Sequence, residues 1–495
     1  MNRRFFLRAT AASAALSVVP KVLLADAAPA LTALLTIHPS QRGFAIAPDF
    51  LGLSYESAQL AHPEFFSVQN ADFAGYLSAL NPNGVLRIGG NTSGYAFWAP
   101  HHPQAANGGS TVPESVGPDT GGPLSTFTQT TPQAIRNLRE FLDRIQWRCI
   151  YGLNFAKGTP EQAAEEAAAV SAILGDRLIC FQFGNEVDNF AKKGLRPVGY
   201  NYSAFAVEWA NFYHAVNARV PNVKVAGPDS ASTGAWIREF AEQFGKEVMM
   251  LTTHYYAEGP PSDPSMTIER LLNPANPRWD TGIPNIREAM AESHLPFRLT
   301  ETNSCFHGGK PGVSNTFASS LWALDLMFQL VQLGGSGINF HGGGYGWYTP
   351  VAGTMENGFV ARPEYYAMLL FSQLLGGHVV SSHLDAPEAA TDSSPALVCY
   401  ALQNASGKLQ AVVINKSATA SYKMTVQANA AAERILLQRL IAPSLEDQAD
   451  VTFAGAPVGM RGAWRAERNE HVNLKNGAAI CFIPAASAAL LTWES

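Results

Sequence analysis

The chain has 495 residues, of which 47% are hydrophobic and 15% are charged. This balance supplies ample material for a buried core and lies outside the polar, highly charged range of disordered chains. With 34 Lys and Arg residues against 40 Asp and Glu, the formal charge of −6 gives no basic surplus for phosphates or long polyanions. The composition therefore predicts a folded protein, most simply of two domains, and argues against nucleic acid as a partner.

Residues 1–27 have the pattern of a twin-arginine export signal. Arg3 and Arg4 precede an apolar run at residues 9–19, which is too short to span a bilayer, and Ala25–Ala27 places small residues at a cleavage spacing. Without this segment the chain would hold 30 basic and 39 acidic residues, a net charge of −9. We expect a periplasmic or secreted protein with no membrane span in its mature part.

The five cysteines show no metal-binding spacing. Cys149 and Cys180 lie in apolar runs and are typical of small buried hydrophobic residues. Whether Cys399 and Cys481 pair is left open by the sequence, as is the oligomeric state. We expect neither a metal nor an organic cofactor.

Residues 50–375 alternate short apolar runs with helical patterns, which is typical of βα units around a parallel sheet. Eight such units predict an α/β fold of the (β/α)8 TIM barrel type. The long segment at residues 99–131, rich in Pro and Gly and without Lys or Arg, is expected to form a lid or subsite wall, with a mobile segment as the alternative. The expected strands are Phe50–Tyr55, Val85–Gly89, Arg148–Leu153, Leu178–Phe183, Val223–Gly227, Val248–His254, Pro296–Thr302 and Gly337–His341, with helices such as Pro132–Trp147 between them.

Residues 376–495 change to short alternating strands, which predicts an additional antiparallel β-sandwich domain. The strand-like stretch Leu31–Ile37, within residues 28–49, is expected to join that sandwich at an edge. The expected strands are Leu397–Leu402, Leu409–Ile414, Tyr422–Gln427, Arg434–Leu440, Val451–Phe453, Ala478–Phe482 and Ala489–Trp493.

Two glutamates, Glu186 and Glu301, stand at the ends of the fourth and seventh expected strands. In a closed eight-stranded barrel these strand ends face each other across the mouth. Carboxylates paired across such a gap are typical of glycoside hydrolysis, in which one protonates the leaving oxygen and the other attacks or activates water. A single Glu at a strand end is more often part of a loop ion pair. The second Glu, and Asn185 beside Glu186 as a partner for a sugar hydroxyl, favour the hydrolase.

These motifs resemble the retaining clan of barrel glycosidases and, more narrowly, glycoside hydrolase family 79, the β-glucuronidase and heparanase family. The matching motifs, in chain order, are Phe50–Glu56, Leu86–Asn91, Gly184–Glu186, Thr253–Tyr256 and Glu301–Ser304, with Gly308 and Gly309 behind. The resemblance implies a catalytic barrel joined to a β-sandwich built from both chain ends.

The resemblance also implies a role for each matching residue. Glu186 would be the general acid/base and Glu301 the nucleophile, with the anomeric configuration retained. Asn185 would hold the 2-hydroxyl of the sugar, and Tyr256 would hydrogen-bond Glu301 and keep it ionised.

Two further residues support this assignment less directly. Arg87 on the second strand would lend a positive charge to the nucleophile, with structural packing as the alternative. His254 either orients the catalytic groups or is a buried, satisfied histidine.

The loop after Glu301 bears on the substrate. Family members that bind glucuronate use a tyrosine and a following run of glycines there, whose hydroxyl and N–H groups receive the sugar carboxylate. This chain has Phe306 at the tyrosine position, followed by Gly308 and Gly309, while Tyr348 matches another position that reaches the sugar. Loss of one donor from a charged hydrogen-bond set costs about 1.5–3 kcal/mol.

The sequence therefore predicts an exported, exo-acting retaining β-glycosidase, most simply a β-glucuronidase that hydrolyses terminal glucuronic acid, with His307 or Lys310 as substitutes for the missing hydroxyl. One alternative is a retaining β-glycosidase for a neutral sugar or disaccharide, which Phe306 would favour. Another is a non-catalytic carbohydrate-binding protein, against which both glutamates argue. The net charge of −9 disfavours a sulfated polymer such as heparan sulfate.

Overall fold

The computed structural model describes residues 30–100, 127–273, 275–387 and 396–495. The expected export signal at residues 1–27 and most of the long segment at residues 99–131 lie outside these ranges. Among the described residues, no helix combines the length and apolar character that crossing a membrane requires.

Eight parallel strands close into a barrel in the order β10-β11-β2-β3-β6-β7-β8-β9, which confirms the expected barrel. Their bounds are β2 Leu51–Glu56, β3 Val85–Gly89, β6 Arg148–Leu153, β7 Leu178–Phe183, β8 Val225–Ser230, β9 Val248–Glu258, β10 Phe297–Cys305 and β11 Gly337–His341. Strands β8, β9 and β10 run three to four residues beyond the expected ends. Several polar residues that the sequence would place in loops therefore lie in paired strands. Asn303, for example, pairs with Tyr256.

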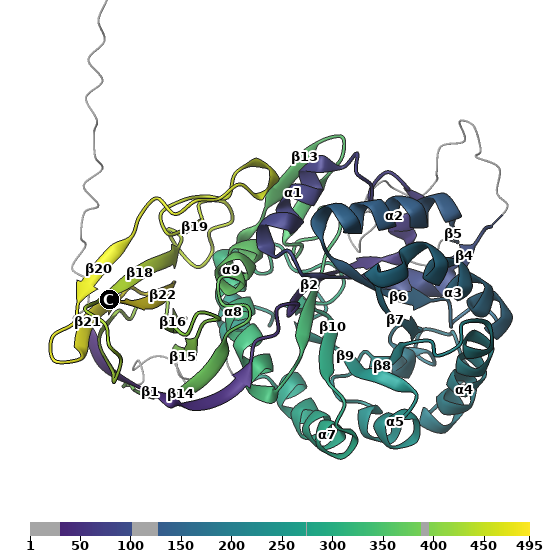
Figure 1. Cartoon of the computed structure of the whole chain (residues 1–495), viewed down its shortest axis with the longest axis horizontal. Helices are drawn as coiled ribbons and strands as arrows, with labels where there is room; N and C mark the ends of the chain where they lie inside the picture. The colour runs from purple at the N-terminus through teal and green to yellow at the C-terminus, as the bar shows by residue number, and fades with distance from the viewer. Residues whose placement is uncertain (1–29, 101–126, 274, 388–395) are drawn as a thin grey trace, which may run out of the picture.

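Helices surround the barrel on its outer side (Figure 1). Helix α2 illustrates how the sequence sets one of them. Thr131 caps its first turn by accepting a hydrogen bond from the Ala134 N–H, Pro132 occupies the first position, and Gln146 ends it in a left-handed conformation. The helices are α1 Ala71–Leu80, α2 Pro132–Ile145, α3 Pro160–Leu174, α4 Tyr202–Arg219, α5 Ile237–Phe244, α6 Ile268–Leu272, α7 Pro277–Ser293, α8 Phe317–Leu333 and α9 Pro363–Ser372.

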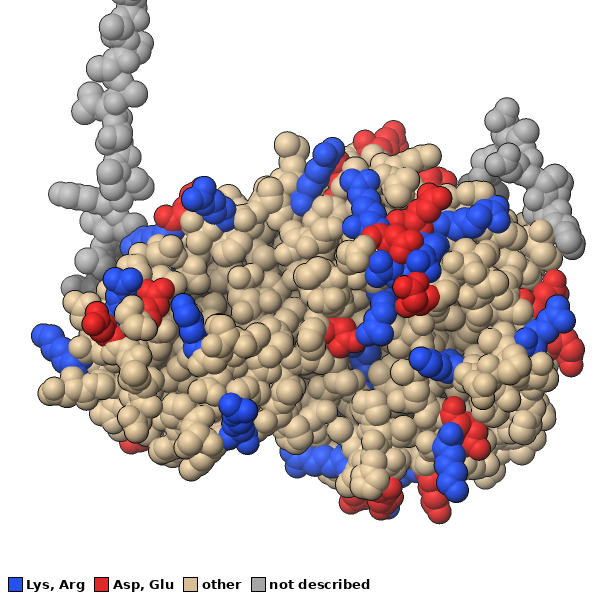
Figure 2. Space-filling view, viewed as in Figure 1, with Lys and Arg blue, Asp and Glu red and all other residues tan. Residues whose placement is uncertain are grey.

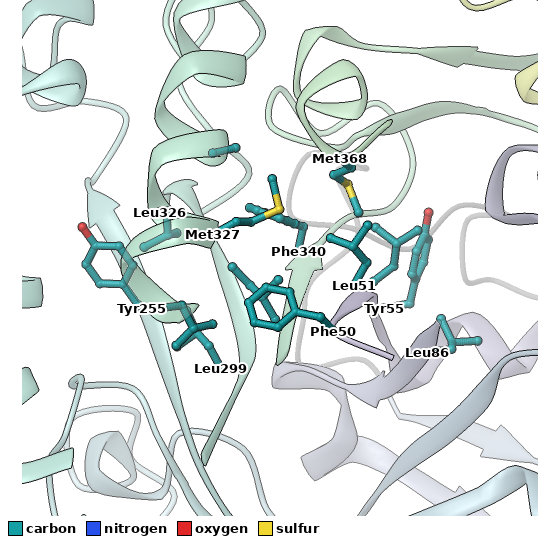
Figure 3. Close-up of a cluster of buried hydrophobic side chains, with 14 of the residues drawn as sticks. Phe50, Leu51, Tyr55, Leu86, Tyr255, Leu299, Leu326, Met327, Phe340 and Met368 are labelled. Carbon is teal, nitrogen blue, oxygen red and sulfur yellow. The ribbon is translucent and has the colours of Figure 1, made fainter. Parts of the chain in front are cut away.

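The main core lies between the barrel strands and these helices. Figure 3 shows Phe340 of β11 and Phe50, which directly precedes β2, in one buried cluster with Met327 of α8 and Met368 of α9. Because the strands are covered on both faces, they appear in the sequence as continuous apolar runs. This pattern makes the barrel strands predictable from the sequence. The short strand pairs β4 Ala96–Trp98 with β5 Thr128–Thr130, and β12 Val351–Thr354 with β13 Gly358–Ala361, lie outside the barrel wall.

The second domain is one curled sheet with the strand order β19-β18-β22-β16-β15-β14-β1-β17-β21, in which β20 also pairs with β18. The expected antiparallel β-domain is thus confirmed, as a single sheet that curls around its own apolar core. Helices α8 and α9 lie between this sheet and the barrel (Figure 1). The strands are β1 Leu31–Ala45, β14 His378–Asp385, β15 Leu397–Gln403, β16 Leu409–Asn415, β17 Tyr422–Ala428, β18 Arg434–Ile441, β19 Thr452–Phe453, β20 Glu470–Asn473, β21 Ala478–Ile483 and β22 Ser487–Glu494.

Strand β1 lies inside the sheet and not at its edge, contrary to expectation. It pairs antiparallel with β14 on one side and parallel with β17 on the other. The partner β14 has no alternating apolar pattern, because most of its side chains are only half-buried or exposed. The sequence therefore does not predict β14, the strand that covers one side of β1.

All five cysteines are free thiols in the structure. Cys399 lies opposite Val413 and Cys481 lies opposite Met424 in the sheet, so the two do not pair with each other. Cys149 and Cys180 are buried, as expected from their apolar surroundings.

A buried ion pair connects the barrel to the β-domain. Asp325 of α8 accepts a hydrogen bond from Lys416 Nζ at 2.8 Å, and both side chains are no more than 6% exposed. The Tyr400 hydroxyl donates to the other oxygen of Asp325. Removing one partner of such a pair leaves a buried charge without compensation, which costs more than removing both.

We therefore expect Lys416→Met to lower the free energy of unfolding by about 3–5 kcal/mol. The double variant Lys416→Met/Asp325→Asn should recover part of that loss, because no uncompensated carboxylate remains. Urea denaturation followed by circular dichroism measures both. The exposed residue Lys408 supplies the control, since Lys408→Met should stay within about 0.5 kcal/mol of the wild type. Wild-type stability of Lys416→Met would refute the role given to this pair.

Candidate active site

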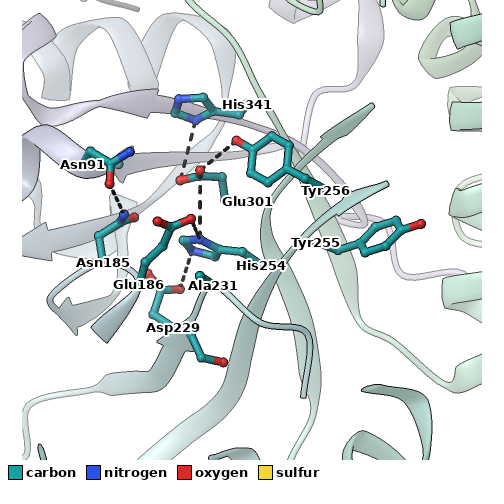
Figure 4. Close-up of polar contacts among 12 residues, drawn as sticks. Asn91, Asn185, Glu186, Asp229, Ala231, His254, Tyr255, Tyr256, Glu301 and His341 are labelled. Atoms are coloured by element: carbon teal, nitrogen blue, oxygen red, sulfur yellow. Dashed lines mark hydrogen bonds and ion pairs between the residues drawn. The ribbon is translucent and has the colours of Figure 1, made fainter. Parts of the chain in front are cut away.

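The barrel mouth brings the two predicted glutamates together. Glu186 follows β7 and has a φ of 55°, a left-handed conformation that directs it over the barrel, and its N–H donates to the Asp229 carbonyl at 2.8 Å. Glu301 lies in β10 and is buried. One oxygen of each carboxylate and a ring nitrogen of His254 lie within 4.8 Å of one another. Figure 4 shows the two side chains converging from opposite sides of the site.

Rigid donors hold Glu301. Arg87 Nη1 donates to Oε2 at 2.7 Å, and the Tyr256 hydroxyl donates to Oε1 at 2.8 Å. His341 Nδ1 lies 3.7 Å from Oε2. Burial alone would raise the pKa of Glu301, but the charges of His341, His254 and Arg87 outweigh it and lower that pKa. Glu301 is therefore an ionised carboxylate with a fixed orientation.

Arg87 is the centre of this network and is completely buried. Besides Glu301, its guanidinium donates to Ser54, Gln182, Asn185 and Asp229. Because the Asn185 Oδ1 accepts from Arg87 at 2.8 Å, the Asn185 amide must present its NH₂ group to the site. Arg87 is thus both buried and in direct contact with Glu301 and Asn185.

His254, on β9, lies between the carboxylates with its side chain fully buried. Its Nε2 is 3.2 Å from Asp229 Oδ1, and its Nδ1 is 3.5 Å from Glu186 Oε1. Burial opposes a charge on the ring, but Asp229 and Glu301 outweigh burial and raise the pKa of His254 to about 10. The ring of His254 is therefore favoured in its charged form, 3.5 Å from Glu186 and 4.0 Å from Glu301.

Glu186 has a different environment from Glu301. Its Oε1 faces His254, and its Oε2 accepts a hydrogen bond from Lys193 Nζ. Burial alone would raise the pKa of Glu186, but the hydrogen bond from His254 and the charge of Lys193 outweigh it and lower that pKa. Lys193 is 31% exposed, so one of the two groups that hold Glu186 ionised borders on solvent.

Three aromatic residues form a wall beside Glu301. The ring centroid of Tyr256 lies 6.1 Å from that of Tyr348 and 6.5 Å from that of Phe306. The guanidinium of Arg278 lies 5.1 Å from the Phe306 ring centroid, which places a positive charge on its face. The predicted residues Tyr256, Phe306 and Tyr348 are thus brought together around one end of the site.

Gly308 and Gly309 connect this wall to the loop after β11. Both have a φ of 89°, and a side chain on Gly309 would meet the Tyr348 backbone nitrogen at 2.8 Å. The Gly308 carbonyl accepts from the Trp347 N–H at 2.7 Å. The N–H groups of these two buried glycines donate to no described residue. Lys310, in contrast, donates to the Asp263 carbonyl at 2.7 Å, and His307 is exposed.

Sequence reasoning missed three charged members of the site. Asp229 and His341 stand at the ends of β8 and β11, the same kind of position that singled out the two glutamates, and could have been found by that signal. Lys193 follows Glu186 in an irregular segment, and no motif marks it.

Glu186, His254 and Glu301 are close enough together to contact one ion. Each carboxylate already accepts from a cation, however, because Arg87 binds Glu301 and Lys193 binds Glu186. A divalent ion would add charge beside these cations and the His254 imidazolium. We therefore assign no metal to this cluster.

Comparisons with known proteins agree with this geometry. The description "Glycosyl hydrolase family 79, N-terminal domain" matches residues 135–328. A β-glucuronidase of Neurospora crassa is 24% identical over 414 residues, 75% of this chain and 70% of the relative. A β-glucuronidase of Aspergillus niger is 25% identical over 74% of this chain and 70% of its own length, and a heparanase of Gallus gallus is 24% identical over 74% and 77%.

Solved structures share the fold. A 4-O-α-L-rhamnosyl-β-D-glucuronidase from Fusarium oxysporum superposes with a TM-score of 0.71 at 17% identity, over 93% of this chain and all of that one. A family 51 arabinofuranosidase from Xanthomonas axonopodis gives 0.66 at 14% identity, over 94% of this chain and all of that one.

The barrel, its paired glutamates and these relatives define a glycoside hydrolase. Within that class, the chain is similar to glycoside hydrolase family 79, whose N-terminal domain description matches residues 135–328.

The charge on His254 generates a pH prediction. Its pKa rises from an ordinary 6.5 to about 10 on folding, so its contribution to stability is complete below pH 6.5 and is lost as the pH rises to about 10. Over this range we expect the free energy of unfolding to fall by up to about 1.4 kcal/mol per pH unit. Urea titrations at pH 6, 8 and 10 measure the fall.

The variant His254→Gln should be less stable than the wild type at pH 6 and should approach it by pH 10. Replacement of the exposed His38 by Gln is the matched control and should keep the wild-type fall. A pH dependence that survives in His254→Gln would show that another group is responsible.

Proposed function

We propose that this protein is an exported, exo-acting retaining β-glycosidase and, more narrowly, a β-glucuronidase that releases terminal glucuronic acid. The observation that carries the retaining mechanism is the approach of Glu186 and Glu301 oxygens to within 4.8 Å. Retaining enzymes place the two carboxyl groups about 5–5.5 Å apart, whereas inverting enzymes need about 6.5–9.5 Å to admit a water molecule.

In the first step of this mechanism, the ionised Glu301 attacks the anomeric carbon while Glu186 gives its proton to the departing oxygen. In the second step, Glu186 takes a proton from water, and the resulting hydroxide displaces Glu301 from the sugar. The NH₂ group of Asn185 would bind the 2-hydroxyl, where contacts strengthen in the transition state. Tyr256 and Arg87 keep Glu301 ionised and oriented for attack.

The choice of glucuronate rests on the loop after β10. Two buried glycines, Gly308 and Gly309, offer N–H groups that donate to no described residue, and a carboxylate is an acceptor that suits them. The relatives named β-glucuronidase and the rhamnosyl-glucuronidase structure support the same choice. Arg278, stacked on Phe306, adds positive charge on the side where the tyrosine hydroxyl is missing.

Export by the twin-arginine route, to the periplasm or outside the cell, belongs to the proposal and is supported by the sequence of residues 1–27. So does a division into a catalytic barrel at residues 50–375 and a β-domain made from residues 28–49 and 376–495.

A second candidate is a retaining β-glycosidase for a neutral sugar or disaccharide, and Phe306 favours it because the ring supplies no donor to a carboxylate.

A long sulfated polymer is disfavoured as a substrate by the distribution of charge on the surface. Figure 2 shows Lys and Arg side chains interspersed with Asp and Glu on the face presented, and not gathered into an extended basic surface. Turnover of 4-nitrophenyl β-glucuronide, compared with that of 4-nitrophenyl β-glucoside, tests the glucuronidase against the neutral-sugar glycosidase. Turnover of only the glucoside would overturn the glucuronidase proposal.

The two glutamates should fail in different ways when replaced. We expect Glu186→Ala to lose about 10²–10⁴-fold in rate on substrates whose leaving group needs a proton, but to keep first-step chemistry on an activated aryl glycoside. Azide should rescue it and give a β-glycosyl azide. Glu301→Ala should lose nearly all turnover and give the inverted α-glycosyl azide.

Product stereochemistry by nuclear magnetic resonance distinguishes the two variants. The exposed residue Glu140 on α2 provides a control, since Glu140→Ala should keep the wild-type rate. Near wild-type turnover by either active-site variant would remove that glutamate from the mechanism.

Phe306→Tyr probes the carboxylate site. If glucuronate is the substrate, a restored hydroxyl should raise kcat/KM for an aryl glucuronide by about tenfold or more, as expected for one hydrogen bond to a charged group. If a neutral sugar packs on Phe306, the same change should lower activity on the glucoside, because a half-buried phenol would lack a partner. Measurement of kcat/KM for both substrates decides, with Phe482→Tyr on the exposed face of β21 as a control.

A further inference from the structure

The ion pair between Lys193 and Glu186 blocks the acid function of Glu186 in the free protein. A general acid must carry the proton that it will donate. The Lys193 ammonium occupies Oε2 of Glu186, and the positive charge of Lys193 favours the ionised carboxylate. Something in the first step must therefore separate the two groups.

Lys193 is the member of the site best able to move. Its side chain is 31% exposed, whereas the Arg87 and His254 side chains are completely buried. Besides Glu186, it donates to Asn91 Oδ1, which also accepts from Asn185 at 3.4 Å. A lysine ammonium on four methylene groups can turn to a new acceptor without movement of the backbone.

A pocket of about 240 Å³ adjoins Lys193. Its walls include Tyr95, Phe190 and Leu195, and the described lining residues contain no Asp or Glu. The pocket adjoins the Lys193 side of Glu186, because Lys193 and the residue before Glu186, Asn185, both line it. Oε1 of Glu186 faces His254, whose Nδ1 lies 4.0 Å from Glu301, while Oε2 faces Lys193. A departing aglycone must lie within reach of Glu186, which protonates the leaving oxygen.

We propose that this pocket selects an aryl aglycone that carries a carboxylate, and that this carboxylate draws the Lys193 ammonium away from Glu186. The apolar walls suit a flat ring, and Lys193 supplies the one permanent charge among the described lining residues. Binding of the correct aglycone thereby frees Glu186 to take up a proton. Glu186 then gives this proton to the aglycone oxygen as the aglycone departs. The inference rests on the proposed glycosidase function and adds the class of aglycone to it.

The groups that face Glu186 define how its titration responds. They are Lys193 from the segment after β7, His254 and Tyr256 from β9, and Glu301 from β10. His254 and Tyr256 stay in place when an aglycone binds, because both are held from inside the barrel. Loss of the Lys193 contact, together with a new negative charge nearby, should therefore raise the pKa of Glu186.

The test compares 3-carboxyphenyl β-glucuronide with 3-carbamoylphenyl β-glucuronide, which have similar shape and differ in charge. We expect the wild type to favour the carboxylate substrate by about 10- to 100-fold in kcat/KM. The basic limb of the kcat profile should also lie at higher pH for that substrate. In Lys193→Met the kcat/KM preference should vanish, and the gap between the two basic limbs should shrink, because only the charge of the substrate itself then separates them.

Two further variants separate charge from structure. Lys193→Arg keeps a cation and should retain part of the preference. The neighbouring exposed residue Lys192 is the matched control, and Lys192→Met should retain all of it. Equal kcat/KM values for the two substrates in the wild type, or a preference that survives in Lys193→Met, would overturn the proposal.

A binding measurement separates this inference from the glycosidase assignment. Calorimetry with 3-hydroxybenzoate, the released aglycone, needs no turnover, and we expect about tenfold weaker binding to Lys193→Met than to the wild type. Equal affinity overturns the pocket assignment even if glucuronides are hydrolysed. If no glucuronide is hydrolysed, the glucuronidase proposal fails, while weaker binding to Lys193→Met still supports the pocket.

Discussion

A single buried guanidinium, that of Arg87, is the interaction on which the active site depends. It satisfies Glu301 and Asp229 as ion pairs and fixes the amide of Asn185 by a hydrogen bond. Together with Arg87 on β3, these groups come from four different barrel strands or strand ends, so the guanidinium is a positive centre around which the barrel closes. A neutral residue there would leave two buried carboxylates with much less compensation, which is energetically costly.

Two kinds of contact make the two carboxylates proposed to be catalytic different from each other. Glu301 is bound by Arg87 and Tyr256, both held within the barrel, and its charge is therefore fixed. Glu186 is held by His254 on one oxygen and by the partly exposed Lys193 on the other. A retaining mechanism needs this asymmetry, because the nucleophile must stay ionised while the acid/base changes its protonation in each step.

The sequence allowed the barrel to be predicted because its strands are buried on both faces and read as apolar runs. The same contrast between an apolar run and a terminal carboxylate identified Glu186 and Glu301. It failed at β14, whose side chains are half-buried or exposed and follow no clear period. Lys193 could not be found either, since its contact with Glu186 arises from the path of an irregular segment that has no pattern of its own.

The same contrast between strand and loop residues separates the residues proposed for catalysis from those proposed for substrate specificity. Arg87, His254 and Glu301 belong to strands whose register is fixed by pairing with neighbours on both sides, so their geometry is set together with the closure of the barrel. Phe306 follows β10 and Lys193 follows β7, both in loops, where a substitution changes one contact and leaves the register intact. A barrel of this kind can therefore acquire a new sugar or aglycone preference without disturbing the charges that carry out the chemistry.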